Sequence, residues 1–180
     1  SSADKFYTSD DVIAGNFSAT PTSVADGFDK LAVYGQDAQG IYRWLIDTDN
    51  DGVADLRVVD PAAINGIPFA GDFDGNSANG DEVGIFDGKK WYLDTNHDYK
   101  VDVGSSFANG IKGWPIAGDF DGDGKDDLAG WTDDKFSIDL ANNGFGQIDA
   151  TIHFGYIGVR ERPVAADIDQ DGIDDLGLFV

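Results

Sequence analysis

Short apolar runs alternate along the whole chain with longer runs that are rich in aspartate and glycine. Runs such as "PIAG" and "DLAGW" span four or five residues, while "YRWLID" and "KKWYLD" carry aromatic side chains. Apolar runs of that length, bounded by Gly and Asp, are typical of β-strands. No stretch keeps a 3.6-residue hydrophobic period over three turns of a helix. The pattern therefore predicts an all-β protein.

These runs belong to a repeat. "PFAGDFDGNSANGDEVGIF" at Pro68, "PIAGDFDGDGKDDLAGW" at Pro115 and "PVAADIDQDGIDDLGLF" at Pro163 share one pattern, and a worn copy begins at Val12. Successive copies stand about 47 residues apart, a period that indicates a propeller or a solenoid. Four short strands in a unit of this length match one propeller blade.

We therefore predict a single β-propeller domain of about four blades, each a four-stranded antiparallel sheet. The stretch "DKFYTS" near the N-terminus resembles "DKFSID" at Asp134, the third strand of a blade. The N- and C-terminal strands are thus expected to share the last blade and close the ring, because an open array leaves unpaired edges. The alternative is a piece of a larger propeller. The predicted parts are a closing strand at 1–10 and blades at 11–62, 63–110, 111–158 and 159–180.

The net charge of the chain excludes some classes of binding partner. The 180 residues include 34 acidic and 12 basic side chains, for a net charge of −22. Nucleic acid is excluded as a partner because phosphate backbones need clustered Lys and Arg. No apolar run approaches the length of a membrane span, so no membrane insertion is expected. The acids stand in regular clusters, which favours defined sites over a generally solvated acidic surface.

The clusters follow the spacing D-x-D-x-D-G-x-x-D. Alternate residues of a tight loop turn three side-chain oxygens towards one centre, the seventh residue offers a carbonyl, and the ninth closes the shell. Calcium takes six to eight such oxygens at about 2.3–2.6 Å, and an ion removes the repulsion between the carboxylates. Asx-turns without a metal are the alternative. EF-hands are disfavoured because strand-like runs follow the loops.

About five calcium sites are predicted. Three loops match fully, one carries two extra residues, and one has Tyr99 at the glycine position. In the worn copy Lys30 replaces the closing acid, so its ammonium is expected to stand in for the ion. A further loop that begins at Asp139 is doubtful. The predicted ligands are Asp47, Asp49, Asp51, Val53 and Asp55; Asp72, Asp74, Asn76 and Glu82; Asp94, Asn96, Asp98, Lys100 and Asp102; Asp119, Asp121, Asp123, Lys125 and Asp127; and Asp167, Asp169, Asp171, Ile173 and Asp175.

"GDFDGDGKDDLAGW" and "ADIDQDGIDDLGLF" resemble the FG-GAP or VCBS repeats of bacterial surface proteins, which are related to the calcium-binding blades of integrin α-subunit propellers. The resemblance covers nearly the whole chain and is strongest over 68–180. It implies a propeller, calcium in the blade loops, an extracellular setting, and a role in adhesion or beside a secreted enzyme. The integrin-like loop carries over onto Asp119, Asp121, Asp123 and Asp127 and two sister loops, but not onto the worn copy. Propellers of this family often have more than four blades.

Aromatic residues that recur at equivalent positions are predicted to pack between blades: Trp44, Trp91 and Phe136, and Tyr34, Phe86, Trp131 and Phe179. Residues that break the repeat are better candidates for specific contacts. Trp114 and Tyr156 are predicted to form a sugar-stacking or partner-binding patch, with local packing as the alternative.

Catalysis finds no support in the sequence, which has no nucleophile elbow, HExxH or phosphate loop. We expect a monomeric, non-enzymatic, calcium-binding interaction or adhesion module, secreted by or on the surface of a bacterium. Its expected partner is an extracellular protein or glycan. A lectin-like module and an accessory module of a secreted enzyme are the alternatives. A lectin would repeat an exposed aromatic residue beside a loop in each blade, whereas the aromatics here fall within strands.

Overall fold

The computed structural model describes residues 11–20, 22–132, 134–140, 148–155 and 162–179. These residues form thirteen strands in four antiparallel sheets, together with one short 3-10 helix, η2 (Val103–Ser105). The all-β prediction is confirmed. Over the same residues, no helix combines the length and the hydrophobicity that crossing a bilayer requires.

Each sheet is a meander, in which every strand pairs antiparallel with the next along the chain. The first sheet holds β1 (Asp11–Gly15), β2 (Lys30–Gln36), β3 (Tyr42–Ile46) and β4 (Leu56–Val59). The second holds β5 (Ile67–Gly71), β6 (Glu82–Phe86) and β7 (Trp91–Leu93). The third holds β8 (Trp114–Gly118), β9 (Asp127–Thr132), β10 (Lys135–Asp139) and β11 (Ala150–His153), and the fourth β12 (Arg162–Ala166) and β13 (Asp175–Phe179).

The four sheets therefore have between two and four strands rather than four each. In the second sheet the fourth strand is reduced to an isolated bridge between Trp91 and Phe107. The strands of each sheet lie within one of the predicted blade spans, although the boundaries themselves stay a prediction. The predicted closing strand at 1–10 lies outside the described residues.

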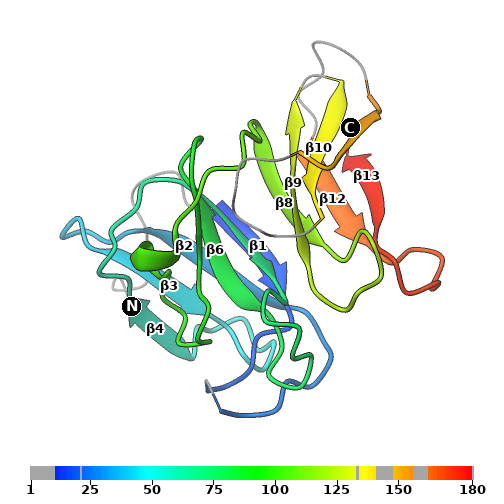
Figure 1. Ribbon diagram of the computed structural model, residues 1–180. Helices are drawn as coiled ribbons and strands as arrows, with labels where there is room; N and C mark the ends of the chain where they lie inside the picture. Colours follow the sequence, from blue (N-terminus) through cyan, green and yellow to red (C-terminus); the bar gives the residue numbers. More distant parts are fainter. Residues whose placement is uncertain (1–10, 21, 133, 141–147, 156–161, 180) are drawn as a thin grey trace.

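Consecutive sheets meet along their first strands. β1 contacts β5, β5 contacts β8, and β8 contacts β12, so the sheets follow one another in chain order (Figure 1). These four inner strands all line one open groove of about 480 Å³. Among the described strands, no comparable contact joins β12 or β13 to the first sheet. A succession of sheets around a shared groove is thus observed, whereas a closed ring is not.

The core lies between the sheets, because each sheet buries one face against the next. Tyr34 and Trp44 of the first sheet cluster with Val83 and Ile85 of the second. The same positions recur in the next two contacts, where Phe86 and Trp91 pack with Leu128, and Trp131 and Phe136 pack with Leu176 and Leu178.

The predicted packing role of the repeated aromatics is confirmed for six of the seven. In the first sheet, Tyr34 and Trp44 are cross-strand partners whose ring centroids lie 4.6 Å apart. In the second, Phe86 and Trp91 are the equivalent pair at 4.4 Å. For Phe179 the prediction is wrong: its side chain is 74% exposed. No described sheet covers that face of β13.

A recurrent pair of hydrogen bonds ties neighbouring sheets together, and we call it the inter-sheet clamp. The residue after each of the first three inner strands donates its N–H to an aspartate of the next sheet, and its carbonyl accepts the N–H of that aspartate. Asn16 pairs in this way with Asp81 (2.8 and 3.2 Å), Asp72 with Asp126 (3.1 and 2.9 Å), and Asp119 with Asp174 (3.0 and 2.8 Å). The clamp places the start of each acidic loop against the following sheet.

Candidate metal centres

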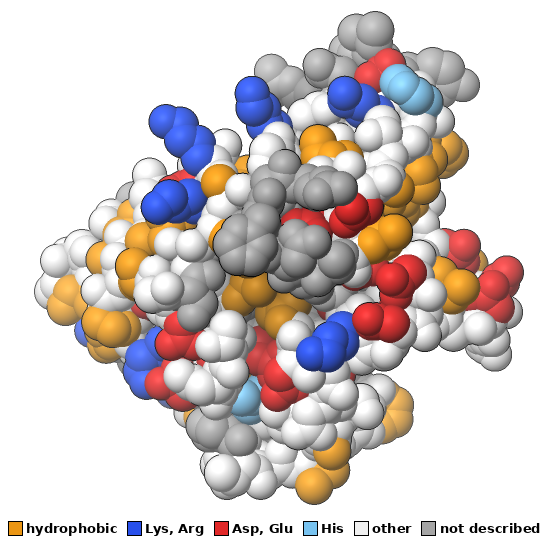
Figure 2. Space-filling view, in the orientation of Figure 1, with side chains coloured by type: hydrophobic (Ala, Val, Ile, Leu, Met, Phe, Trp, Pro, Cys, Tyr) orange, Lys and Arg blue, Asp and Glu red, His pale blue; other side chains and the backbone are white. Residues whose placement is uncertain are grey.

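The acidic loops all connect strands at the same end of their sheets. Loops at Asp72, Asp119 and Asp167 follow the first strand of a sheet, and loops at Asp47 and Asp94 follow the third. First and third strands of a meander run in the same direction, so their ends share one edge. The topology thus gathers the predicted sites on one rim of the molecule. Acidic side chains stand in separate groups in Figure 2.

In four of these loops, three carboxylates converge. In each group one oxygen per residue lies within 4.8 Å of the others. Two oxygens on opposite sides of a calcium ion are about 5 Å apart, given bond lengths near 2.4 Å. The spacing therefore fits one ion among three carboxylates. The groups are Asp47, Asp49 and Asp55; Asp72, Asp74 and Glu82; Asp119, Asp121 and Asp127; and Asp167, Asp169 and Asp171.

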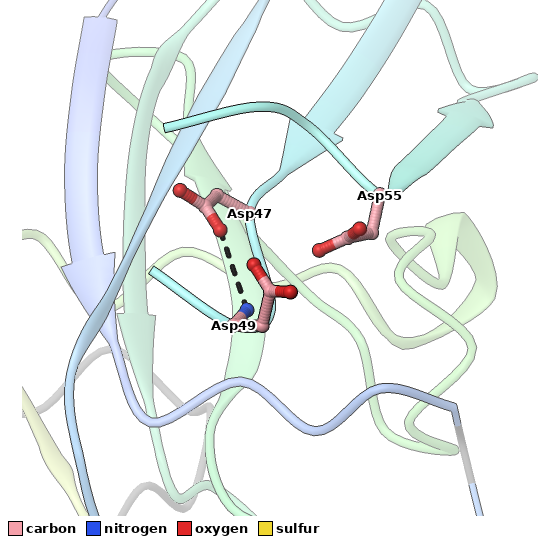
Figure 3. Close-up of side chains that lie close together, drawn as sticks. All are labelled: Asp47, Asp49 and Asp55. Carbon is pink, nitrogen blue, oxygen red and sulfur yellow. Dashed lines mark hydrogen bonds between the residues drawn. The ribbon is translucent and has the colours of Figure 1, made fainter. Parts of the chain in front are cut away.

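The first of these groups is drawn in Figure 3. The three carboxylates lie around a common space, and the N–H of Asp49 donates to Oδ1 of Asp47 at 3.3 Å. Asp47 is buried at the end of β3, while Asp49 is exposed. The site is thus open to solvent on one side, which leaves room for water among the six to eight ligands that calcium needs.

The side-chain carboxylate of the first aspartate shapes the turn by accepting backbone N–H groups from later residues of the loop. In the loop at Asp119, Oδ1 accepts the N–H groups of Gly122 (2.7 Å) and Asp123 (3.1 Å), and Oδ2 accepts that of Gly124 (2.9 Å). The closing Asp127 accepts the N–H of Phe120 at 3.0 Å. These bonds hold the carboxylates in place through the chain itself, as in Asx-turns.

In four of the five loops, two positions adopt the left-handed conformation, whereas the loop at Asp72 does so at its fourth position, Gly75, but not at its sixth. The glycine at the sixth position is one, with φ +84° at Gly52 and +88° at Gly124, as predicted. Tyr99 takes the same conformation at φ +59° despite its side chain, so that loop keeps the turn without glycine. The fourth position is the other, and the acid spacing alone does not predict it. Gly75 and Gly122 at that position in two loops were the available signal.

In these four loops, three of the predicted carboxylate ligands lie outside the converging groups. Asp51 and Asp123, at the fifth position, accept the N–H of the residue two further on, at 2.8 and 2.9 Å. Asp175 accepts the N–H of Ile168 at 3.2 Å. The coordination by Asn76 and by the carbonyls of Val53, Lys125 and Ile173 stays a prediction.

The fifth predicted loop, 94–102, is arranged differently. All its residues are described, yet it does not bring three carboxylates as close together as the other four loops do. Lys100 donates its Nζ to Oδ2 of Asp98 at 2.8 Å, and Thr95 bonds Asp102 through both its N–H and its hydroxyl. Calcium coordination by Asp94, Asn96, Asp98, Lys100 and Asp102 therefore remains a prediction.

Glu82 links its group to a buried polar chain that the sequence did not reveal. Its Oε1 lies 2.8 Å from Nδ1 of His97, and Nε2 of His97 lies 3.0 Å from Oγ of Ser18. The order of acid, imidazole and hydroxyl matches a nucleophilic triad. However, Ser18 and His97 are 2% exposed and Glu82 is fully buried, so no substrate reaches the hydroxyl. These hydrogen bonds position Glu82 and join the first two sheets.

Lys30 occupies the closing position of the worn copy. Its side chain is buried, and Nζ donates to Oδ1 of Asp26 and, at 2.7 Å, to the carbonyl of Phe28. A carboxylate and a carbonyl are both oxygen ligands that calcium accepts. The ammonium thus bonds the kinds of atom that an ion would bond, which supports its interpretation as a stand-in.

Burial and crowding raise the pKa values of several loop carboxyls. Burial, followed by the charges of Asp121, Asp123 and Asp119, raises the pKa of Asp127 to about 7. Burial and the charge of Glu82 raise the pKa of Asp72 to about 6. These carboxyls therefore keep their protons to a higher pH than ordinary aspartates do, unless a cation offsets their charges.

Trp114 and Tyr156 were predicted to form a binding patch. The indole of Trp114 is half-buried and stacks with Arg162, whose Cζ lies 4.6 Å from the ring centroid. Tyr156 lies outside the described residues. The patch stays a prediction.

Comparisons with known proteins leave the family open. No family model matches the chain, and the curated proteins contain no match. Among solved structures, the chain is similar to the biofilm matrix protein Bap1 of V. cholerae, with 14% identity and a TM-score of 0.45. The likeness covers 98% of this chain and 29% of Bap1. Values this low do not establish a family, so the resemblance to FG-GAP and VCBS repeats stays a prediction.

Proposed function

We propose that the chain is a calcium-binding module of the FG-GAP or VCBS type, in which ions hold the loops at one rim of a propeller-like row of sheets. The observation that carries this proposal is the convergence of three carboxylates in each of four loops. Four like-charged groups of this kind destabilise the folded chain unless a cation is bound. Calcium suits them because all the ligands are oxygen and the oxygen spacing fits its bond length.

The module acts outside the cell and binds a protein or a glycan rather than catalysing a reaction. Loops of this kind in extracellular modules bind calcium with dissociation constants of roughly 10⁻⁴ to 10⁻³ M. Sites of that affinity are occupied at the calcium concentration outside the cell but not at that of the cytosol. Among the described residues, Ser18, His97 and Glu82 are hydrogen-bonded in the order of a catalytic triad, but all three are buried in the core. A lectin role has less support, since Trp44, Trp91 and Trp131 are buried and Trp114 stacks on Arg162.

Calcium titration by calorimetry tests the proposal, with Asp121→Asn compared with Asp134→Asn. The two changes remove the same charge, but Asp121 belongs to a converging group, whereas Asp134 faces His153 at 3.7 Å. Asp121→Asn is expected to weaken or remove one site, and Asp134→Asn to leave all sites intact. Equal calcium binding by the two variants and the unaltered chain would count against the proposal.

A further inference from the structure

Among the described residues, the first and fourth sheets each leave one face without a neighbouring sheet, and these faces carry the residues that the internal contacts bury. Leu31 of β2 is 56% exposed, whereas its equivalents Val83 and Leu128 are fully buried. At the other end, Phe179 is 74% exposed, although its equivalents Tyr34, Phe86 and Trp131 are buried. We call these the first-sheet face (Val12, Leu31, Val33 and Leu45) and the fourth-sheet face (Val164 and Phe179).

The two faces are complementary because each is one half of a contact that the chain makes three times. Between the third and fourth sheets, Trp131 packs with Leu176 and Leu178. Phe179 occupies the place of Trp131, and Leu31 and Val33 occupy the places of Leu176 and Leu178. Beside this face lies a hollow of about 340 Å³, lined by Leu31, Val33 and Leu45 and by residues of the acidic loop that include Asp47 and Val53.

The inter-sheet clamp is likewise left in two halves. Asp29 stands where Asp81, Asp126 and Asp174 accept an N–H, but among the described residues no inner-strand N–H donates to its carboxylate. The N–H of Asp167 stands where those of Asn16, Asp72 and Asp119 donate. Both the apolar faces and the clamp therefore point to one kind of occupant, a sheet of this same repeat.

We propose that the fourth-sheet face of one copy of this chain packs on the first-sheet face of a second copy, in the geometry of the internal contacts. Such a contact joins two different surfaces, so copies assemble head to tail. Two copies close into a ring if the rotation between them allows it, and otherwise they extend as a filament. This proposal departs from the expectation of a monomer.

Two features weaken the contact relative to the internal ones. Ala166 stands where the other inner strands end in Gly15, Gly71 or Gly118. A Cβ at Gly118 would lie 2.7 Å from the carboxylate of Asp174 and 3.0 Å from Cβ of Ala165, so the methyl of Ala166 keeps the sheets slightly apart. Each copy also carries a net charge of −22, which opposes association at low ionic strength. Association is therefore expected in the presence of both salt and calcium.

Light scattering after size-exclusion chromatography tests the proposal with the full chain in calcium and salt. At high micromolar concentration the unaltered chain is expected to exceed the mass of one copy. Phe179→Asp and Leu31→Asp are each expected to weaken association about tenfold or more, because a charge is buried in an apolar contact. The control Val103→Asp changes an exposed residue of η2, away from both faces. A single-copy mass for the unaltered chain, or association that Phe179→Asp does not reduce, overturns the proposal.

Mixing the two variants tests the head-to-tail arrangement. Phe179→Asp keeps an intact first-sheet face, and Leu31→Asp keeps an intact fourth-sheet face. An equimolar mixture is therefore expected to form a two-copy species through one intact contact, although neither variant does so alone. A mixture that stays monomeric overturns the arrangement. Melting curves in calcium verify folding, and Phe179→Ser or Leu31→Ser replaces any variant that does not fold.

Ala166→Gly provides a test in the opposite direction. It restores the glycine found at the end of the other inner strands, so it is expected to tighten association measurably. An unchanged affinity overturns the claim that the contact repeats the internal geometry. Calcium titration of the same variants keeps this outcome separate from the proposed function, since none of the changed residues belongs to an acidic group.

Discussion

Single residues in the loops combine two tasks, shaping the backbone and presenting oxygens. Asp119 accepts three backbone N–H groups and still places an oxygen beside those of Asp121 and Asp127. Hydrogen bonds within the loop thus support the turn. A bound ion is expected to relieve the repulsion between the carboxylates that the turn brings together.

The Lys30 site gives the first prediction. Lys30→Asp removes a buried ammonium from Asp26 and places a second acid beside it. Without calcium we expect a loss of about 3–5 kcal/mol in the free energy of unfolding, because the new carboxylate at position 30 is buried without a cation beside it. Calcium is expected to restore part of that loss by filling a new site, as urea unfolding with and without calcium would reveal.

Lys112→Asp is the control, because it makes the same charge change at an exposed residue. It is expected to alter stability by less than about 0.5 kcal/mol, whether or not calcium is present. If calcium restores nothing in Lys30→Asp, the ammonium is not a substitute for an ion.

The raised pKa values give a prediction for the calcium-free protein. A carboxyl whose pKa is higher in the folded chain than in the unfolded chain stabilises the fold fully below the unfolded value, which is about 4. That stability is lost as the pH rises through the folded value, which is about 6 for Asp72 and about 7 for Asp127. In chelator, the melting temperature is therefore expected to fall between pH 5 and pH 8.

Calcium should suppress this dependence, because the ion replaces the proton as the partner of these carboxylates. Melting curves at several pH values, in chelator and in calcium, make the comparison. A melting temperature in chelator that rises over the same pH range would contradict the raised pKa values of the loop carboxyls.

The spacing of acids could be predicted from the sequence because ligand chemistry repeats every second residue in a tight loop. The buried chain from Ser18 through His97 to Glu82 could not, because its members stand far apart along the chain and meet only when two sheets pack. Tyr99 illustrates a further limit. Its departure from glycine suggested a damaged loop, yet the backbone there keeps φ at +59°.

At the scale of elements, the repeat explains both the strands and their contacts. Each inner strand ends beside the next inner strand, and the clamp fixes the acidic loop at that junction. Loop and interface are thus built from adjacent residues, such as Asp126 and Asp127. Ion binding at the loop and packing between sheets are expected to support each other.

The clamp can be tested with two equivalent aspartates. Asp81→Ala leaves the N–H of Asn16 without its acceptor in a part-buried position and is expected to lower the free energy of unfolding by about 1–3 kcal/mol. Asp29→Ala removes the equivalent side chain where no described donor bonds it, so a change of less than about 0.5 kcal/mol is expected. Chemical unfolding at low protein concentration measures both. Equal losses would show that the clamp contributes nothing specific.

The strand pattern could be predicted from sequence because apolar runs and Asp-Gly turns alternate so regularly. The number of strands in each sheet could not. The pairing near Phe107 is reduced to a single bridge, since strand length there depends on a partner strand rather than on local propensity.

At the scale of the whole molecule, the sheets form a succession whose two outer faces remain apolar. The exposure of Phe179 could not be predicted from the repeat, because equivalent positions imply equivalent packing only where a neighbouring sheet exists. The sequence likewise leaves open whether the row closes within one chain. The uncovered faces at Leu31 and Phe179 are the structural basis for assembly between copies.

The central claim is that calcium in the acidic loops stabilises the folded chain. The most direct test is thermal unfolding in excess chelator and in calcium at neutral pH. At about ten times the dissociation constant, each ion adds about 1.4 kcal/mol, so four sites add several kcal/mol. For a chain of this size that corresponds to a rise of roughly 10–20 °C in melting temperature. The account predicts such a rise with calcium, and a melting temperature that is the same in chelator and in calcium would contradict it.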